Sequence, residues 1–219
     1  MIGDFTDILC RDLLAARRSG GHWAHGAVFF VMFIMLVAFA LGPQQSDRAL
    51  IASALVWLAA CLASQLSLAH LFAPDLRDGT LDCWVSDGRS VVSFVLGKCT
   101  AHWILVFIPI LLLAPFGALM LGAPIADLLA LVLSLVIGGP ALILLGGLAS
   151  ALCANLRGGG MLIVLISGPL LAPPLIFGVG AAEAGLEAMA LLKILGAISL
   201  AAAVFGSFIS ALALKTHLE

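Results

Sequence analysis

Residues 127–152 read DLLALVLSLVIGGPALILLGGLASAL, and this stretch decides what kind of fold the chain can adopt. After Asp127 it contains no charged residue. A helix needs about 20 apolar residues to cross the roughly 30 Å hydrocarbon core of a bilayer, and this stretch exceeds that length. Its apolar residues are continuous and do not alternate with polar ones. The pattern therefore predicts a membrane-spanning helix and not a strand.

Five further apolar stretches qualify or nearly qualify as spans: 23–42, 49–72, 100–122, 161–179 and 189–214. The whole chain is 63% hydrophobic and only 10% charged, whereas soluble domains carry roughly 25% charged residues. No basic cluster interleaved with aromatic residues is present, so nucleic acid is not an expected partner. We predict an all-α membrane protein, with residues 1–219 forming one domain of six transmembrane helices in a lipid bilayer.

Turn residues separate the spans, and charge orients them. Gly42-Pro43 and Gly122-Ala123-Pro124 end the first and third spans, and Asp127 can cap the fourth helix. Cytoplasmic loops of membrane proteins carry the excess of Lys and Arg. Eight basic residues fall on one side of the six predicted spans, and two fall on the other. The first set is Arg11, Arg17, Arg18, Arg77, Arg89, Lys98, Arg157 and Lys215, and the second is Arg48 and Lys193. We therefore expect both termini in the cytoplasm.

Residues 2–18 have the pattern of an amphipathic helix. Ile2, Phe5, Leu9, Leu13 and Ala16 share one face, and Asp4, Asp7, Arg11 and Arg18 lie opposite. Such a helix can lie in the membrane interface with its apolar face toward the lipid. It can equally pack on the cytoplasmic ends of the protein's own spans.

The predicted cytoplasmic loop 73–98 opens with an unusual concentration of charge, in the stretch FAPDLRDGTLD at 72–82. Pro74 suits the first turn of a short helix. On one continuous helix Asp75, Asp78 and Asp82 would share a face, and three carboxylates there would repel one another. The stripe predicts a docking helix for a basic cytoplasmic partner. A solvated helix without function, a divalent-metal site and an enzyme site are the alternatives.

Two local motifs in this region point to enzymes but are incomplete. Asp78-Gly79 resembles the start of the DGxxAR motif of intramembrane CDP-alcohol phosphotransferases, but Asp82-Cys83 replaces its Ala-Arg pair and its later paired Asp residues are absent. Gly97-Lys98 resembles part of a phosphate-binding loop, but Val92 and Cys99 stand where Gly and Ser or Thr are required. We expect no catalytic, cofactor or metal site, so any ATP that drives the protein must bind another chain.

Polar and small residues inside the spans admit structural or functional interpretations. Pro169, Pro173 and Pro174 predict that the fifth span breaks near 173–174, which would give either a transport hinge or an ordinary kink. The pairs Gly146/Ser150 and Gly147/Ala151 favour close helix packing, within the bundle or across a dimer. Gln65 is expected to bond to a neighbouring helix. His22, His25, His70 and His102 are expected to be interfacial side chains. Five scattered cysteines predict reduced thiols and not disulfides.

With six spans, an amphipathic first helix and a charged cytoplasmic loop, the chain resembles an ABC-type permease. More specifically, it resembles the haem exporter protein B family, the permease subunits of the cytochrome c maturation ABC transporter, over essentially its whole length. LFAPDLRDGTL at 71–81, GKCTAHW at 97–103, Gly139-Pro140, LRGGG at 156–160, and Pro169-Leu170 with PLIF at 174–177 carry this resemblance through their order and spacing.

The resemblance implies an ABC-2-type bundle in the bacterial inner membrane, without catalytic activity of its own, that serves haem export or delivery in c-type cytochrome biogenesis. Its implied partners are a cytoplasmic ABC ATPase subunit, a second copy of the chain and haem-handling membrane subunits. Together with the charge pattern, it predicts that the ATPase docks on Asp75, Leu76, Arg77, Asp78, Gly79, Leu81 and Asp82. The other two hypotheses are an intramembrane lipid-modifying enzyme of the CDP-alcohol phosphotransferase type and a non-transporting scaffold of an assembly complex.

Overall fold

The computed structural model describes residues 2–18, 24–42, 45–68, 71–156, 159–184 and 189–218, and these form an all-helical bundle. The described helices are α1 (Ile2–Arg18), α2 (His25–Ala40), α3 (Gln45–Leu68), α4 (Ala73–Arg77), α5 (Thr80–Ser86), α6 (Val91–His102), α7 (Ile108–Met120), α8 (Leu128–Cys153), α9 (Gly159–Glu183), α10 (Met189–Ala201) and α11 (Ser207–Thr216). A π-helical segment at Trp103–Phe107 joins α6 to α7, and another at Ala202–Gly206 joins α10 to α11. A short 3₁₀ turn at Ile125–Asp127 precedes α8.

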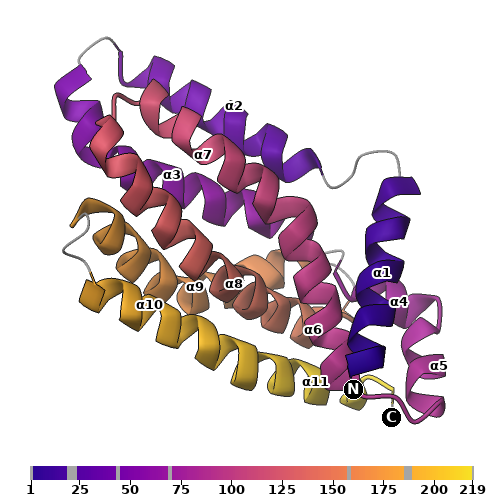
Figure 1. Ribbon diagram of the computed structural model, residues 1–219. Helices are drawn as coiled ribbons and strands as arrows, with labels where there is room; N and C mark the ends of the chain where they lie inside the picture. The colour runs from indigo at the N-terminus through magenta and orange to yellow at the C-terminus, as the bar shows by residue number, and fades with distance from the viewer. Residues whose placement is uncertain are drawn as a thin grey trace.

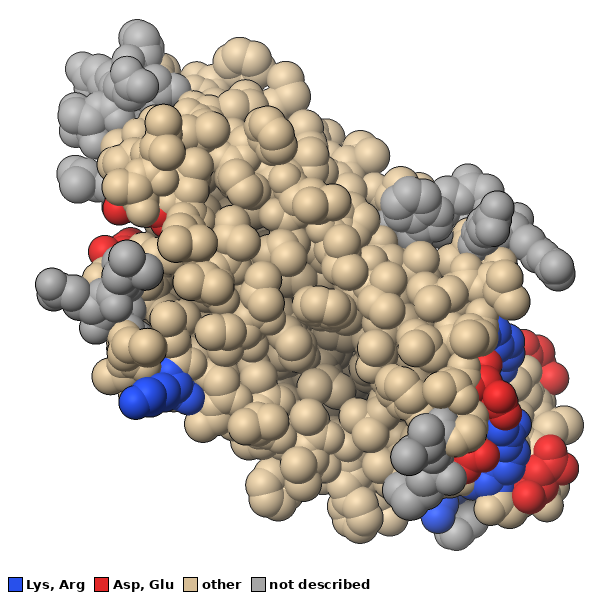
Figure 2. Space-filling view, in the orientation of Figure 1, with Lys and Arg blue, Asp and Glu red and all other residues tan. Residues whose placement is uncertain are grey.

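The long helices alternate in direction, so the connections gather at two ends of the bundle (Figure 1). The beginning of α1, the end of α11, and the short helices α4 and α5 lie together at one end. The end of α2, the beginning of α3, the connection from α7 to α8, the end of α9 and the beginning of α10 lie at the other. Figure 2 shows that most charged side chains of the visible face gather at the first end, while the long sides of the bundle are apolar.

Within the described residues, five helical stretches are long and apolar enough to cross a membrane: the part of α3 that begins at Ile51, Val91–Met120, Ile125–Cys153, Gly160–Glu183 and Met189–Thr216. A sixth apolar helix, α2, is shorter, at 16 residues. The predicted all-helical membrane fold is therefore confirmed, with five long spans and one shorter candidate. The third span is longer than predicted, because α6 begins at Val91 and so takes in residues that were expected to be loop.

Helix α8 is the centre of the bundle and packs against α3, α6, α7, α9, α10 and α11. Its glycines let large side chains from other helices approach its backbone. Gly138 lies against the Trp57 ring, Gly139 against Phe107, and Gly146 against Leu68. The two small-residue pairs of α8 are thus used inside the bundle: Ser150 donates a hydrogen bond to the Leu68 carbonyl oxygen at 2.6 Å, and Gly147 and Ala151 are buried.

Trp57 of α3 is the largest side chain that is fully enclosed in the core. Its indole Nε1 donates a hydrogen bond to Ser134 Oγ at 2.9 Å, which satisfies the ring's polar atom inside the apolar interior. Gly178 of α9 also lies against this ring. A single tryptophan therefore fixes the spacing of α3, α8 and α9.

The predicted break of the fifth span near Pro173-Pro174 is wrong. Helix α9 runs without interruption from Gly159 to Glu183 and contains Pro169, Pro173 and Pro174. A break within the bilayer would leave additional backbone groups without partners in lipid, whereas a continuous helix loses only the donors that the prolines lack. Asp127 stands at the N-cap position of α8, but its side chain makes no capping hydrogen bond.

Two glycines of α9 provide a matched test of this packing. A Cβ at Gly178 would collide with the Trp57 ring, whereas a Cβ at Gly168 would meet no atom within 4 Å. We expect Gly178→Ala to destabilise the protein by about 1–3 kcal/mol through overpacking. Gly168→Ala should be neutral or slightly stabilising, because alanine is the better helix former. Thermal unfolding of the two variants in detergent measures the difference, and equal midpoints would contradict the packing described here.

Candidate functional site

The charged loop folds as two short helices separated by a tight turn, so the predicted continuous acidic helix is wrong. Helix α4 ends at Arg77, and Gly79 adopts a φ of +75°, which favours glycine. Asp78 Oδ1 accepts a hydrogen bond from the Thr80 backbone N–H at 3.0 Å. Hydrogen bonding from Thr80 lowers the pKa of the Asp78 carboxyl. The Asp-Gly turn redirects the chain, so that Asp75 and Asp82 do not share a helix face.

The seven residues predicted to dock an ATPase divide into buried and exposed groups. Asp75 and Leu81 are buried and Leu76 is partly buried, while Arg77, Asp78 and Asp82 are exposed, and Gly79 forms the turn. The structure brings them into one region that we call the polar cap: α1, α4, α5 and the first two turns of α6. Leu81 packs in an apolar cluster of the cap with Ile8, Trp84 and Phe94.

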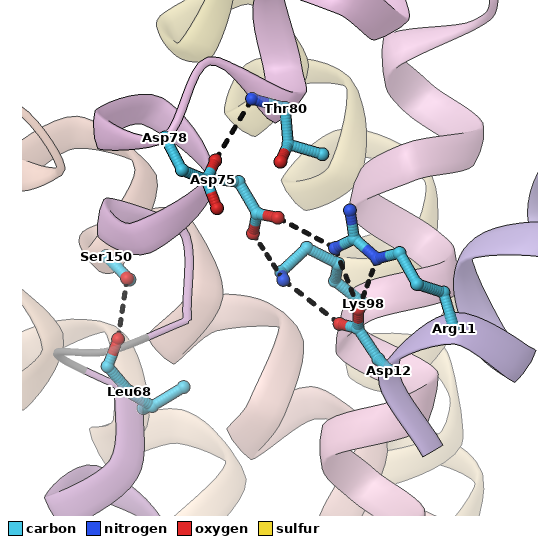
Figure 3. A network of polar contacts seen from close by, with 8 residues as sticks. All are labelled: Arg11, Asp12, Leu68, Asp75, Asp78, Thr80, Lys98 and Ser150. Atoms are coloured by element: carbon cyan, nitrogen blue, oxygen red, sulfur yellow. Dashed lines mark hydrogen bonds and ion pairs between the residues drawn. The ribbon is translucent and has the colours of Figure 1, made fainter. Parts of the chain in front are cut away.

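Asp75 belongs to a closed ring of ion pairs that joins three helices (Figure 3). Its Oδ1 lies 2.7 Å from Arg11 Nη2 of α1, and its Oδ2 lies 2.5 Å from Lys98 Nζ of α6. Asp12 of α1 completes the ring, at 2.8 Å from Arg11 Nη2 and 3.0 Å from Lys98 Nζ. Two cations thus alternate with two carboxylates. The ring is neutral overall and ties α1 and α4 to α6.

The surroundings of the ring are apolar. The side chains of Asp75 and Lys98 are each only 8% exposed. The cationic groups of Arg11 and Lys98 lie 5.8 Å and 5.7 Å from the centre of the Phe94 ring. Burial opposes the charged form of Arg11, but its hydrogen bond with Asp12 and the charge of Asp75 outweigh that effect and raise its pKa. The charges of Asp75 and Lys98 are therefore stable only because their partners in the ring are in place.

A second set of charged contacts holds the beginning of α1. Arg89 donates hydrogen bonds to Asp4 at 3.0 Å and to Asp7, and its guanidinium lies 3.6 Å from the centre of the Trp84 ring. The hydrogen bond from Arg89 lowers the pKa of the Asp4 carboxyl. Between the two charged sites, Ile8 is buried close to Gly97 of α6, where a Cβ would come within 3.1 Å of α1. Helix α1 is thus attached along its length.

The orientation of α1 differs from the sequence expectation. The face of α1 that was predicted to be charged carries Asp4, Asp7 and Arg11. These side chains turn toward the loop between the second and third spans, where Asp75 and Arg89 are their partners. Among the residues of the predicted apolar face, Phe5, Leu9 and Leu13 are only half-buried, and Leu14 beside that face is 56% exposed. The structure favours the interpretation of α1 as a helix packed on the protein's own spans, and lipid contact through the predicted apolar face stays a prediction.

Sequence reasoning missed the roles of Arg11, Asp12, Arg89 and Lys98 as partners of the acidic residues. Arg11, Arg89 and Lys98 entered the sequence analysis only as basic residues or motif letters, and Asp12 did not enter it. Several of these pairings join residues 64 or more positions apart, such as Arg11 with Asp75 and Asp4 with Arg89, and no local spacing reveals them. One usable signal exists: a lysine close to a strongly apolar run needs a carboxylate partner once it is buried.

The other polar residues that were singled out have mostly structural contacts. Gln65 donates a hydrogen bond to Ser167 of α9 at 2.7 Å, as predicted. His102 is partly buried with its Nε2 3.0 Å from Ser67 Oγ, while His25 is exposed, and the interfacial placement of both stays a prediction. His22 and His70 lie outside the described residues. Across the described ranges, no three His, Cys, Asp or Glu side chains are grouped so that they could hold a metal ion.

The fold and the polar cap show the class of this chain: it is a polytopic helical membrane protein whose charged elements gather at one end. Comparison with known sequences then identifies its family. Residues 4–217 match the model of the CcmB protein family. The heme exporter protein B of Rhodobacter capsulatus is 40% identical over 215 residues, which cover 97% of this chain and 99% of that relative. Those of Paracoccus denitrificans and Escherichia coli K12 are 38% and 34% identical, with 97% and 98% of this chain covered and 99% of each relative.

The chain therefore belongs to the CcmB family, which confirms the prediction of a haem exporter permease subunit and not an enzyme. The similarity extends over the cap as well as the spans, since the matched region begins at residue 4.

The ion-pair ring predicts unequal effects of two aspartate substitutions. Asp75→Ala would leave Lys98 and Arg11 short of a buried partner, and removing one member of a buried ion pair costs about 3–5 kcal/mol. Asp82→Ala, the matched control, alters an exposed carboxylate and should cost less than about 0.5 kcal/mol. Thermal unfolding in detergent and the rate at which trypsin removes α1 measure the difference. Asp75→Leu combined with Lys98→Leu should recover part of the loss, and a further decrease would contradict the buried pairing.

Proposed function

We propose that this chain is the membrane permease subunit of an ABC transporter for haem export or delivery in c-type cytochrome biogenesis, and that a separate cytoplasmic ATPase subunit drives it through the polar cap. The carrying observation is the ring formed by Arg11, Asp12, Asp75 and Lys98, which joins the loop helix α4, together with α1, to a membrane-spanning helix. A force applied to α4 therefore reaches α6 through these ion pairs.

The proposed mechanism is a rigid-body movement of the cap that ends in the bundle. ATP binding would close two ATPase subunits and displace α4 and α5, and the ring would carry this displacement into α6. Helix α6 leads into the π-helical segment Trp103–Phe107, which is followed by Pro109. Such segments interrupt the regular helical hydrogen bonding and recur at functional sites. The third span can therefore bend here while the cap moves as one body.

The proposal includes six crossings with both termini in the cytoplasm. The beginning of α1 and the end of α11 lie at the same end of the bundle, which supports an even number of crossings with α2 as the sixth. As a helix α2 spans about 24 Å, close to the hydrocarbon thickness. Arg11, Arg77, Arg89, Lys98 and Lys215 belong to the cap end, where lysine and arginine favour the cytoplasmic side.

The remaining partners follow from the family resemblance and are part of the proposal. They are a second copy of the chain and haem-handling membrane subunits, assembled with it as an ABC-2-type bundle in the bacterial inner membrane. Two alternatives are less well supported. A lipid-modifying enzyme would need converging carboxylates, but Asp78 serves a turn and Asp82 points to solvent. A scaffold would not need ATP hydrolysis by its partner, and that requirement can be tested directly.

Topology is the first test. A reporter fused after Asp78 should be active in the cytoplasm, and one fused after Glu183 should be active on the outer side, because the two positions lie at opposite ends of the bundle. Paired fusions to a cytoplasmic fluorescent reporter and to a secreted phosphatase measure the side. Phosphatase activity at Asp78 would overturn the proposed orientation and, with it, the docking of an ATPase on the cap.

Docking is the second test. Reversing Asp78 and Asp82 together to Lys changes two exposed charges and removes the hydrogen bond from the Thr80 N–H, but it leaves Gly79 in the turn and Asp75 in the ring, so the cap should still fold. We expect this variant to retain its span packing and to lose most of the co-purifying ATPase subunit, since like charges across an interface cost several kcal/mol. Co-purification from detergent and ATP hydrolysis by the complex in vesicles are the measurements. Undiminished co-purification would contradict docking at the cap, and cytochrome assembly that needs no ATP hydrolysis would favour the scaffold.

A further inference from the structure

The buried apolar side chains of the described residues gather in two main cores, one toward each end of the bundle. The far-side core includes Phe30, Ile34, Trp57, Ile110 and Leu131, and the cap-side core includes Ile8, Phe72, Phe94, Ile143 and Leu214. Trp103 and Leu145 are partly buried and pack against both cores. The spans are therefore not packed as one continuous unit from end to end, and a thin boundary separates the two cores.

Both π-helical segments lie at this boundary. In the third span, Cys99 belongs to the cap-side core and Ile110 to the far-side core, and the segment that joins α6 to α7 lies between them. In the sixth span, Leu195 belongs to the far-side core and Ala211 to the cap-side core, and the segment that joins α10 to α11 lies between them. A π-helical segment is one of the few recognised causes of a kink within a helix.

The two segments lie against the same part of α8. The first segment ends with a phenylalanine ring against Gly139. Just before the second segment, Ser199 donates a hydrogen bond to the Ile137 carbonyl oxygen at 2.5 Å, and Gly206 at the end of the segment lies near the Leu144 carbonyl oxygen. The two irregular segments are thus at the same depth in the bundle.

The backbone hydrogen bonding of α8 is interrupted at this depth as well. Pro140 has no N–H to donate to the Val136 carbonyl oxygen. In the neighbouring π-helical segment, the Ser207 hydroxyl donates to the carbonyl oxygens of Ala203 and Val204. Side-chain hydroxyls thus satisfy backbone groups here, so the helices can change their bend without exposing bare carbonyls to lipid.

The remaining two long spans are also irregular where they cross the boundary. In α9, Ile163 packs in a small cluster with the cap-side end of α8, Leu171 belongs to the far-side core, and Pro169 lies between them. Helix α3 passes from one core to the other within residues 63–68, where two serines donate hydrogen bonds to carbonyls of the helix itself. Such bonds are associated with bending of helices.

We infer that this layer is a hinge, at which a cap-side body and a far-side body tilt against each other while each keeps its own core packed. The hinge layer comprises residues 63–68 of α3, Trp103–Phe107, Pro140, Pro169 and Ala202–Gly206. This goes beyond the bend of the third span in the proposed function, because all five long spans bend together and α8 is included. Two packed bodies joined by a few irregular positions are the usual architecture of a hinge movement.

Spin labels on the chain alone test the hinge without any partner. In a Cys10→Ser background, nitroxides on the exposed Cys83 and on Ile125→Cys span the layer, whereas Cys83 with Leu212→Cys reports within the cap-side body. The other three cysteines are buried. In nanodiscs that each hold one chain, pulsed spin-resonance distances should be at least about 1.5-fold more broadly distributed across the layer than within the body. Equal widths would overturn the hinge.

Two prolines provide a matched pair of variants. Pro140→Ala restores an N–H within the hinge layer, and Pro115→Ala makes the same change in α7, on the far side of the layer. We expect Pro140→Ala to narrow the distribution across the layer to about the width measured within the cap-side body, because a regular helix bends less. Its thermal unfolding midpoint should stay equal or rise, which separates stiffening from damage to the fold. Pro115→Ala should leave the distribution unchanged.

These outcomes are separate from those that test the proposed function. A broad distribution across the layer that narrows with Pro140→Ala but not with Pro115→Ala supports the hinge, whether or not an ATPase subunit binds the cap. A width that neither proline variant changes, or that both change equally, would show that the layer is not where the chain bends. Failure of the ATPase subunit to co-purify would overturn the proposed function and leave the hinge measurement intact.

Discussion

The polar cap depends on the ring of charges formed by Arg11, Asp12, Asp75 and Lys98. Asp75 and Lys98 are nearly buried and costly to withdraw from water, and that cost is offset by their pairing with each other and with Arg11 and Asp12. The ring therefore ties α1, α4 and α6 together. The apolar side chains of Ile8, Leu81 and Phe94 exclude water from it and strengthen the attraction.

The membrane part of the molecule solves a different problem, because lipid provides no hydrophobic force that would press helices together. Here the helices adhere through close contact at glycines and through a few buried hydrogen bonds. The Trp57 ring against Gly138 and Gly178, with Ser134 as its hydrogen-bond partner, illustrates both. The bundle is thus tightly packed around α8, while α6 and α10 each lead into a π-helical segment. A rigid cap joined to a bundle with two irregular helices is suited to moving one part against the other.

Local sequence predicted the starts and ends of helices correctly where these depend on interactions between neighbouring residues. Pro74 does begin a short helix, and Gly42 and Gly122, both with positive φ, end helices as predicted. Predictions from local sequence were wrong where contacts between distant residues, or the requirements of the lipid environment, outweighed the local pattern. The spacing of Asp75, Asp78 and Asp82 indicated one acidic face, but Gly79 turns the chain and Lys98 draws Asp75 inward. Three prolines indicated a broken fifth span, but the need to satisfy the backbone in lipid keeps α9 continuous.

The sequence by itself determined that the chain is a helical membrane protein, roughly where its spans lie and to which family it belongs. Long apolar runs, turn residues and the order of short motifs are properties of neighbouring residues, so they can be read without coordinates. Only the tertiary structure decided which charges are buried and which remain free to meet a partner. That distinction depends on contacts such as Arg11 with Asp75 and Arg89 with Asp4, which form only after helices far apart in the sequence have packed together.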